Sequence, residues 1–182
     1  MILNQYQLDA FRTCKVFEDD YTKNLAHMVM GMTSEQNELH SALDKEDYVN
    51  ALEEIADIFW YIAGYCTFRN YKLQDIYNLP STNIVDYINC ISKLTDIVKK
   101  AMVYNKEIDI EKEMEYLNNI CKNLNAMIDY INNEFDLKLD LITALTNNIN
   151  KLKVRFPDKY SDELANNRNL DEELEQLKKN IV

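Results

Sequence analysis

The sequence predicts an all-α fold from three features: few helix breakers, a high hydrophobic content and no linkers. Its 182 residues include only two glycines and two prolines, too few for the tight turns of all-β or dinucleotide-binding folds. Hydrophobic residues make up 47% of the chain, and no glycine- or serine-rich linker interrupts them. We expect one helical domain over residues 1–182, which at this length buries about 70% of its unfolded surface without disulfides or a structural metal.

Hydrophobic residues recur at helical spacing in segments that are bounded by capping residues or helix breakers. In chain order, the predicted helices cover residues 4–30, 33–43, 48–69, 82–104, 109–135, 137–155 and part of the tail 161–182. Residues 72–79 form a loop or a short helix. The charged helix of the tail is expected at the periphery.

Local signals set the boundaries in the first half of the chain. The first helix can break near residues 19–21. Thr33 or Ser34 is the expected N-cap of the second helix, because a short hydroxyl side chain can accept a hydrogen bond from the first helical turn. Residues 44–47 form a turn and supply a new cap before the helix that begins at Tyr48.

Prolines and capping residues set the boundaries in the second half. Pro80 ends the segment before the fourth long helix, and Ser81 or Thr82 can cap that helix. Asp109 starts the next helix. Pro157 ends the helix after that, because proline cannot continue the helical hydrogen bonds.

Two segments of the chain resemble each other. Residues 72–84 and 137–149 align at an offset of 65 positions, and the same offset places Asn119 and Lys122 where two acids of the first half lie. This favours two tandem helical repeats, the second degenerate because it lacks the acids. Chance similarity between helices of like composition is the alternative.

Charge and composition exclude several classes of function. A net charge of -11 argues against general nucleic-acid binding, although a divalent metal would still allow a nucleotide ligand. The N-terminus has no signal-peptide pattern, and no run of about 18 apolar residues predicts a membrane span. Four cysteines without a C-x-x-C motif are expected to be reduced core residues of a cytoplasmic protein.

Two acidic pairs lie on neighbouring predicted helices. Glu35 and Glu38 are three residues apart, as are Glu54 and Asp57, so each pair shares one helix face. A short turn packs these helices antiparallel, which brings four carboxylates together. Each would cost several kcal/mol to bury unpaired, so we expect a divalent cation between them. Oxygen-only ligands favour Mg²⁺ or Mn²⁺ over zinc.

The alternative is that Glu35 and Glu38 are ordinary solvated surface acids. Two observations favour the metal site. Residues 48–68 contain only three charged side chains, Glu53, Glu54 and Asp57, and the two acidic pairs lie on adjacent helices.

Four motifs follow one another in a recognisable order. YQ-x-x-A-x-R-T spans residues 6–13, and GM-x-x-E spans residues 31–35. The acids then read E-x-x-E, fifteen residues, and E-x-x-D. The closing segment at residues 147–168 reads NNINKLKVRFPDKYS-x-x-x-ANNR, which contains N-x-x-K-L-x-x-R-F-P. Together they resemble the MazG-like, all-α nucleoside triphosphate pyrophosphohydrolases, a superfamily that includes dimeric dUTPases and phage dCTPases.

The resemblance implies a function and a set of catalytic residues. Members of this superfamily hydrolyse nucleoside triphosphates to the monophosphate and pyrophosphate with Mg²⁺, for nucleotide-pool control or house-cleaning. Glu35, Glu38, Glu54 and Asp57 correspond to the metal ligands. Glu35 is expected to position or deprotonate the attacking water.

A second group of residues corresponds to the triphosphate contacts. Asn148, Lys151 and Arg155 can lie on one helix face, as phosphate binding requires. A basic helix end that interacts with the helix dipole before Pro157 is the alternative. The implied architecture is a MazG-like bundle, with a catalytic half at about 1–80, a degenerate repeat and phosphate-binding helix at about 81–160, and a helical tail at 161–182.

The sequence departs from the family pattern in ways that leave alternatives open. Gln36 and Asn37 stand where many members have a glycine between the acids. A nucleotide-binding protein with weak catalysis and a helical protein-interaction module therefore remain rivals to the enzyme. The helices 82–104 and 109–135 could complete the site within one chain, or the site could form in a homodimer.

Several other polar and aromatic residues have weaker assignments. Lys93, Asn119 and Lys122 either face the phosphates or lie on the surface. His27 and His40 are expected to be surface or hydrogen-bonded helical residues. Trp60 and Tyr61 are expected in the core, and the alternative is that one of them stacks on a base.

Overall fold

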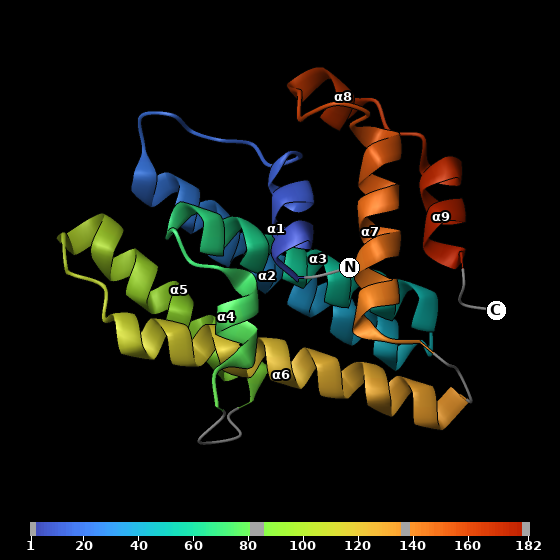
Figure 1. Cartoon of the computed structure of the whole chain (residues 1–182), viewed down its shortest axis with the longest axis horizontal. Coiled ribbons are helices and arrows are strands. Elements are labelled where there is room, and N and C mark those ends of the chain that lie inside the picture. The colour runs from blue at the N-terminus through green and yellow to red at the C-terminus, as the bar shows by residue number, and fades with distance from the viewer. Residues whose placement is uncertain (1–2, 81–85, 136–138, 180–182) are drawn as a thin grey trace.

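The computed structural model describes residues 3–80, 86–135 and 139–179, and every regular element in these ranges is a helix (Figure 1). In chain order the helices are α1 (Leu3–Phe11), α2 (Tyr21–Asp44), α3 (Tyr48–Phe68), α4 (Leu73–Asn78), α5 (Tyr87–Tyr104), α6 (Ile110–Phe135), α7 (Leu141–Arg155), α8 (Asp162–Asn166) and α9 (Leu170–Lys178). The predicted all-α fold is confirmed.

The hairpin of α2 and α3 carries all four predicted acids. Asp20 caps α2 by accepting a hydrogen bond from the backbone N–H of Lys23 at 2.8 Å. Asp47 caps α3 in the same way, accepting from the N–H of Asn50 at 3.2 Å. Each cap satisfies a donor that the first helical turn would otherwise leave unpaired.

The prediction of a separate helix over residues 33–43 is wrong, because α2 is continuous. Thr33 does not cap a helix; its hydroxyl donates to the carbonyl oxygen of Val29, one turn earlier, at 2.9 Å. The first predicted helix ends early, at Phe11, and the chain re-enters a helix only at Tyr21.

Aspartates also begin the later helices. Asp86 caps α5 and Asp140 caps α7, each accepting a backbone N–H two or three residues further on. Both helices therefore begin later than predicted. The predicted caps Ser81 and Thr82 lie outside the described residues, as does Leu137.

Both glycines of the chain lie where α2 and α3 touch. A Cβ atom at Gly31 of α2 would overlap the ring of Tyr61 of α3. A Cβ atom at Gly64 of α3 would overlap the sulfur of Met28 of α2. Each helix thus receives a large side chain of the other, and only glycine permits this approach.

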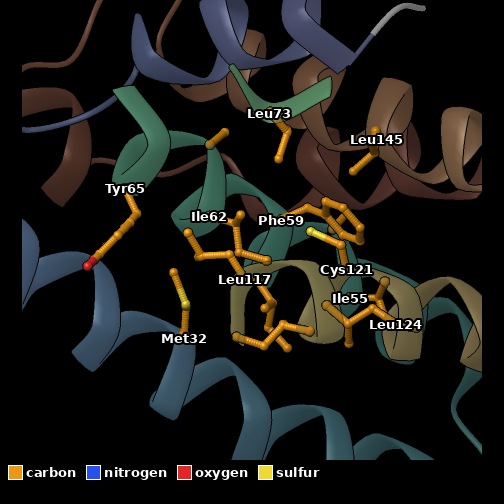
Figure 2. Close-up of a cluster of buried hydrophobic side chains, with 14 of the residues drawn as sticks. Met32, Ile55, Phe59, Ile62, Tyr65, Leu73, Leu117, Cys121, Leu124 and Leu145 are labelled. Atoms are coloured by element: carbon orange, nitrogen blue, oxygen red, sulfur yellow. The ribbon is translucent and has the colours of Figure 1, made fainter. Parts of the chain in front are cut away.

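The hydrophobic core surrounds α3. Ile55, Phe59 and Ile62 of α3 are fully buried and lie beside Leu117 and Cys121 of α6 (Figure 2). Burying each large apolar side chain contributes about 1.5–3 kcal/mol relative to exposure. Core packing therefore fixes the position of α3, and with it the position of the polar side chains on its other face.

A buried acid fastens α6 to the end of α3. Glu113 is fully buried and accepts hydrogen bonds from the hydroxyls of Tyr65 at 2.5 Å and Tyr71 at 2.6 Å. Arg69 forms an ion pair with the same carboxylate at 2.8 Å. The carboxylate is satisfied on both oxygens, as a buried charge must be.

The α7 helix packs against α3 on one side and α9 on the other (Figure 1). Asn147 of α7 donates hydrogen bonds to the carbonyl oxygens of Leu177 at 3.2 Å and Lys179 at 2.6 Å. Glu173 and Leu177 of α9 are buried. The tail helix is therefore packed against the bundle, not peripheral as predicted.

The cysteines and the hydropathy of the helices agree with two further predictions. All four cysteines, Cys14, Cys66, Cys90 and Cys121, are buried thiols. Among the described residues, no helix combines the length and the apolar composition that crossing a membrane requires.

Candidate active site

Three of the four predicted acids converge between α2 and α3. Glu35, Glu38 and Glu54 each offer a carboxylate oxygen, and these oxygens lie within 4.8 Å of one another. Glu54 is only 5% exposed, Glu35 is half-buried and Glu38 is exposed. We call these three residues the acid cluster.

Burial and mutual repulsion perturb the acid cluster. Burial raises the pKa of Glu54 to about 9, and the nearby charge of Asp57 adds to this. Burial, followed by the charge of Asp57, raises the pKa of Glu35 to about 7. Within the described residues, no lysine or arginine forms an ion pair with the cluster. Without a cation, the cluster retains protons at neutral pH.

Asp57, the fourth predicted ligand, is held by α7. The Lys151 ammonium donates to both Asp57 oxygens, at 2.6 and 2.9 Å, and to Glu53 at 3.0 Å. The amide of Asn148 donates to the same carboxylate at 2.5 Å. Burial would lower the pKa of Lys151, but the charges of Asp57 and Glu53 raise it, so this lysine, only 2% exposed, stays charged.

The structure thus brings two predicted phosphate contacts, Asn148 and Lys151, to the predicted acids within one chain. The link is to Asp57 and not to the acid cluster. Asn148 is itself held by the hydroxyl of Tyr6, which donates to its side-chain oxygen at 3.3 Å. The α1 helix therefore contacts α7 at the point where α7 packs against α3.

A cavity of about 250 Å³ lies beside these groups. Its lining residues come from α2, α3, α7, α8 and the segments that follow α1 and α7: Thr13, Lys15, His27, Glu35, Asp57, Trp60, Tyr61, Lys151, Leu152, Arg155, Phe156, Tyr160 and Ala165. Glu35 is the member of the acid cluster that reaches it. The volume is below the roughly 300–1,000 Å³ of most ligand pockets, so a nucleotide would be buried only in part.

Aromatic side chains form one wall of the cavity. Trp60 and Tyr61 meet edge to face, with ring centroids 4.8 Å apart. The indole N–H of Trp60 donates to the Thr13 hydroxyl at 2.9 Å, which fixes the orientation of the ring. Both rings are partly buried and pack against the hydrophobic core, as predicted, and both also line the cavity.

His27 also lines the cavity. Its ring lies edge-on to Phe17 and to Tyr61, with both centroid distances 6.0 Å. Its Nδ1 atom is buried and has no hydrogen-bond partner among the described residues. Burial, and then the charge of Lys15, lower the pKa of His27, so the ring is neutral at pH 7. The prediction of a surface or hydrogen-bonded residue holds for His40, which bonds to Tyr87, but is wrong for His27.

Arg155, the third predicted phosphate contact, lines the cavity but is bound to a carboxylate of α9. Its Nε and Nη2 atoms donate to Glu173 at 3.0 and 2.5 Å. Arg168, in the loop between α8 and α9, donates to the same carboxylate at 2.7 Å.

The residues suggested from the degenerate repeat do not reach the cavity. The Lys93 ammonium lies 5.5 Å from the centre of the Tyr116 ring, and that of Lys122 lies 4.2 Å from the centre of the Tyr77 ring. Asn119 donates to a carbonyl oxygen of its own helix. Among the described residues, α5 and α6 contribute none to the cavity lining. Lys93 is exposed and Lys122 is half-buried, which favours the surface alternative for the two lysines, whereas Asn119 is buried within α6 and fits neither alternative.

Sequence reasoning missed four polar residues near the cavity: Lys15, Tyr160, Arg168 and Glu173. Lys15 forms an ion pair with Asp162, 147 positions further along the chain, at 2.5 Å. Glu173 lies in the tail helix, whose charge predicted a peripheral position. Arg168 ends the closing segment of the resemblance, where it had no assigned role. Only the tertiary fold brings these residues to the site.

Comparison of the chain with protein-family profiles, with curated proteins and with solved structures finds no match.

Proposed function

We propose that this protein is a metal-dependent pyrophosphohydrolase that cleaves a nucleoside triphosphate into the monophosphate and pyrophosphate. One observation carries the proposal: the acid cluster, with three carboxylate oxygens within 4.8 Å, lies beside a cavity that also contains lysine, arginine and aromatic side chains. Phosphoryl transfer needs these components, namely acids for metal, cations for phosphate and a surface for the base. The motif resemblance to MazG-like enzymes, with their helical bundle and tandem repeats, points the same way.

The acid cluster suits Mg²⁺ or Mn²⁺. Its donors are all hard oxygens, and the raised pKa values of Glu35 and Glu54 mark a place with more negative charge than the protein balances. Glu35, Glu38 and Glu54 would hold the ion, which would neutralise charge on the phosphate oxygens. Asp57 would join them only if Lys151 released it.

The remaining residues of the site have separate roles in this proposal. Glu35 belongs to the acid cluster and also faces the cavity, so it is placed to orient or deprotonate the attacking water. Lys151 and Asn148 hold Asp57, and they would contact the triphosphate only if they released it. Trp60 and Tyr61 offer ring faces to the base.

A nucleotide-binding protein with weak or no catalysis is the second candidate. The observation in its favour is that Lys151 and Asn148 engage Asp57, which leaves only three acids in the cluster. A protein-interaction module is the third, and it predicts no nucleotide affinity at all. Nucleotide-pool control in the cytoplasm is the cellular role that fits the enzyme.

The test is a screen of ribo- and deoxyribonucleoside triphosphates for pyrophosphate release. We expect turnover with Mg²⁺ or Mn²⁺, none in EDTA, and none in Glu35→Gln with either metal. Glu172→Gln, an exposed acid on α9, is the matched control and should keep full activity. Nucleotide binding without turnover would support the second candidate, and turnover that persists in EDTA would exclude the proposed metal chemistry.

A further inference from the structure

The cationic side chains near the cavity differ in how much of their charge is balanced by neighbouring carboxylates. Lys15 is matched by Asp162 at 2.5 Å. Lys151 is outnumbered, because it contacts both Asp57 and Glu53. Neither lysine brings surplus positive charge to an incoming polyanion.

The arginines are arranged in the opposite way. Arg155 and Arg168 both donate through Nη2 to the same Glu173 oxygen, at 2.5 and 2.7 Å, so their guanidinium groups lie side by side. Two positive charges share one negative charge, and the group keeps a net charge of +1. Glu173 is only 2% exposed, and although burial would raise its pKa, the two arginines hold it at about 2. The carboxylate therefore stays ionised and keeps both partners.

Donors remain available on both arginines. A guanidinium group has five N–H donors in a rigid fork, and Glu173 uses only one edge of each. Arg155 lines the cavity directly. Ala165, three residues before Arg168, lines it too, so the segment that carries Arg168 reaches the same space. Arg168 is 42% exposed and so is accessible to a ligand.

We propose that Arg168, together with Arg155, binds a phosphate group of the substrate, and that Glu173 is the positioning residue that holds both guanidinium groups at the edge of the cavity. The proposal rests on the proposed function for the identity of the ligand, a polyphosphate ester. Paired guanidinium groups suit such a ligand, because each can form two parallel hydrogen bonds to phosphate oxygens. The polyphosphate would then lie between the acid cluster and the C-terminal segment.

Substituting Glu173 distinguishes two roles of this carboxylate, because they predict opposite changes in anion affinity. If it only dilutes the positive charge of the site, Glu173→Gln raises the net charge by one and should tighten the binding of an anion. If it positions the arginines, the same substitution should weaken binding despite the added positive charge. If Glu173 only anchors α9, Glu173→Gln should lower the melting temperature, and the folded variant should bind the anion as tightly as the wild type.

The experiment is a calorimetric titration of the full chain with inorganic triphosphate in Mg²⁺. We expect Arg168→Gln to weaken binding about tenfold or more, the effect of losing a charged hydrogen bond, and Glu173→Gln to weaken it at least as much. The controls are Lys153→Gln on α7 and Glu172→Gln on α9, which make the same charge changes at exposed positions and should leave affinity within about twofold. Circular dichroism and thermal melting establish that each variant is folded. Because the Arg168 side chain is exposed, Arg168→Gln is the variant least expected to disturb folding.

Three results would overturn the inference: no triphosphate binding by the wild-type chain, unchanged affinity in Arg168→Gln, or unchanged or tighter binding in folded Glu173→Gln. The proposed function is tested separately. If triphosphate binding depends on the arginines but no nucleotide is hydrolysed, the inference stands and the enzyme assignment fails. If nucleotides are hydrolysed and KM is the same in Arg168→Gln, the assignment stands and the inference fails.

Discussion

Replacing Glu54 with glutamine should affect stability and activity in opposite directions. Glu54 is buried in the acid cluster, and glutamine keeps its shape while removing the charge. Because no lysine or arginine in the described part of the chain pairs with the cluster, the carboxylate destabilises the metal-free fold. The same carboxylate is needed if the cluster holds a cation.

The size of the effect follows from the pKa of Glu54, which folding raises from 4.5 to about 9. A carboxyl group with a raised pKa keeps its proton in the folded state while the unfolded chain has lost it, so stability falls as pH rises above 4.5. At pH 7 the raised pKa of Glu54 lowers the free energy of unfolding by at most about 3 kcal/mol. Solvent screening, and the sharing of a proton with the half-buried Glu35, reduce this loss to about 1–2 kcal/mol. Glu54→Gln should raise the free energy of unfolding by that amount in EDTA.

Urea unfolding in EDTA, followed by circular dichroism at pH 5 and pH 8, measures this effect. The gain in Glu54→Gln should be small at pH 5 and larger at pH 8. In Mg²⁺ the wild type should recover stability, whereas the variant should recover less and release no pyrophosphate. Glu53→Gln is the matched control: it makes the same change one residue away, but removes an ion pair with Lys151 at 3.0 Å. It should not stabilise the protein.

One result would refute this reasoning directly. If Glu54→Gln is less stable than the wild type in EDTA at pH 8, the Glu54 carboxylate is a structural hydrogen-bonding group and not a repelled charge. Equal stabilisation of both proteins by Mg²⁺ would show that the ion binds elsewhere.

Three further predictions concern other parts of the site. Gly31→Ala places a Cβ atom against the ring of Tyr61, and calorimetry should show a destabilisation of about 1–3 kcal/mol; an unchanged melting temperature would mean that the ring moves freely. Lys151→Met leaves Asp57 without its cation, and urea unfolding at pH 7 should show a loss of about 3–5 kcal/mol, whereas a gain would show that the buried pair is not needed for stability. The lowered pKa of Glu173 contributes stability above pH 4.5 that is lost as pH falls towards 2, so Glu173→Gln should flatten the acid limb of a pH–stability curve, and an unaltered limb would contradict this.

The parts of the fold that local sequence signals determine were predicted well. The α3 and α6 helices begin and end within a residue or so of the predicted positions, because their apolar periodicity is long and aspartates precede them. The break predicted within α2 is wrong because Thr33 satisfies its hydroxyl inside the helix, an outcome that a capping rule cannot distinguish from a true cap. The packing of α9 depends on contacts with α7, which no local pattern of charges indicates.

In the candidate site, too, local spacing predicted some of the residues, whereas others depend on tertiary packing. The spacing of Glu35, Glu38 and Glu54 predicted a cluster because helix periodicity fixes which residues share a face. The pairing of Asp57 with Lys151 could not be predicted, because those residues lie 94 positions apart and meet only through the packing of α7 on α3. The Nδ1 atom of His27 has no hydrogen-bond partner in the described part of the chain, and this likewise depends on which neighbours surround it after folding.

If the acid cluster holds an ion as proposed, the reciprocal glycine contacts between α2 and α3 have a consequence for its selectivity. They set how closely the helix that carries Glu35 approaches the helix that carries Glu54, and hence the width of the gap that a cation would fill. Mg²⁺ needs oxygens at about 2.0–2.1 Å, whereas Ca²⁺ needs about 2.3–2.6 Å and more ligands. A methyl group at Gly31 or Gly64 would act as a spacer, and on the proposed function it would shift the preference of the site towards the larger ion. If the cluster holds an ion as proposed, the choice of metal would be governed partly by two residues that have no side chain.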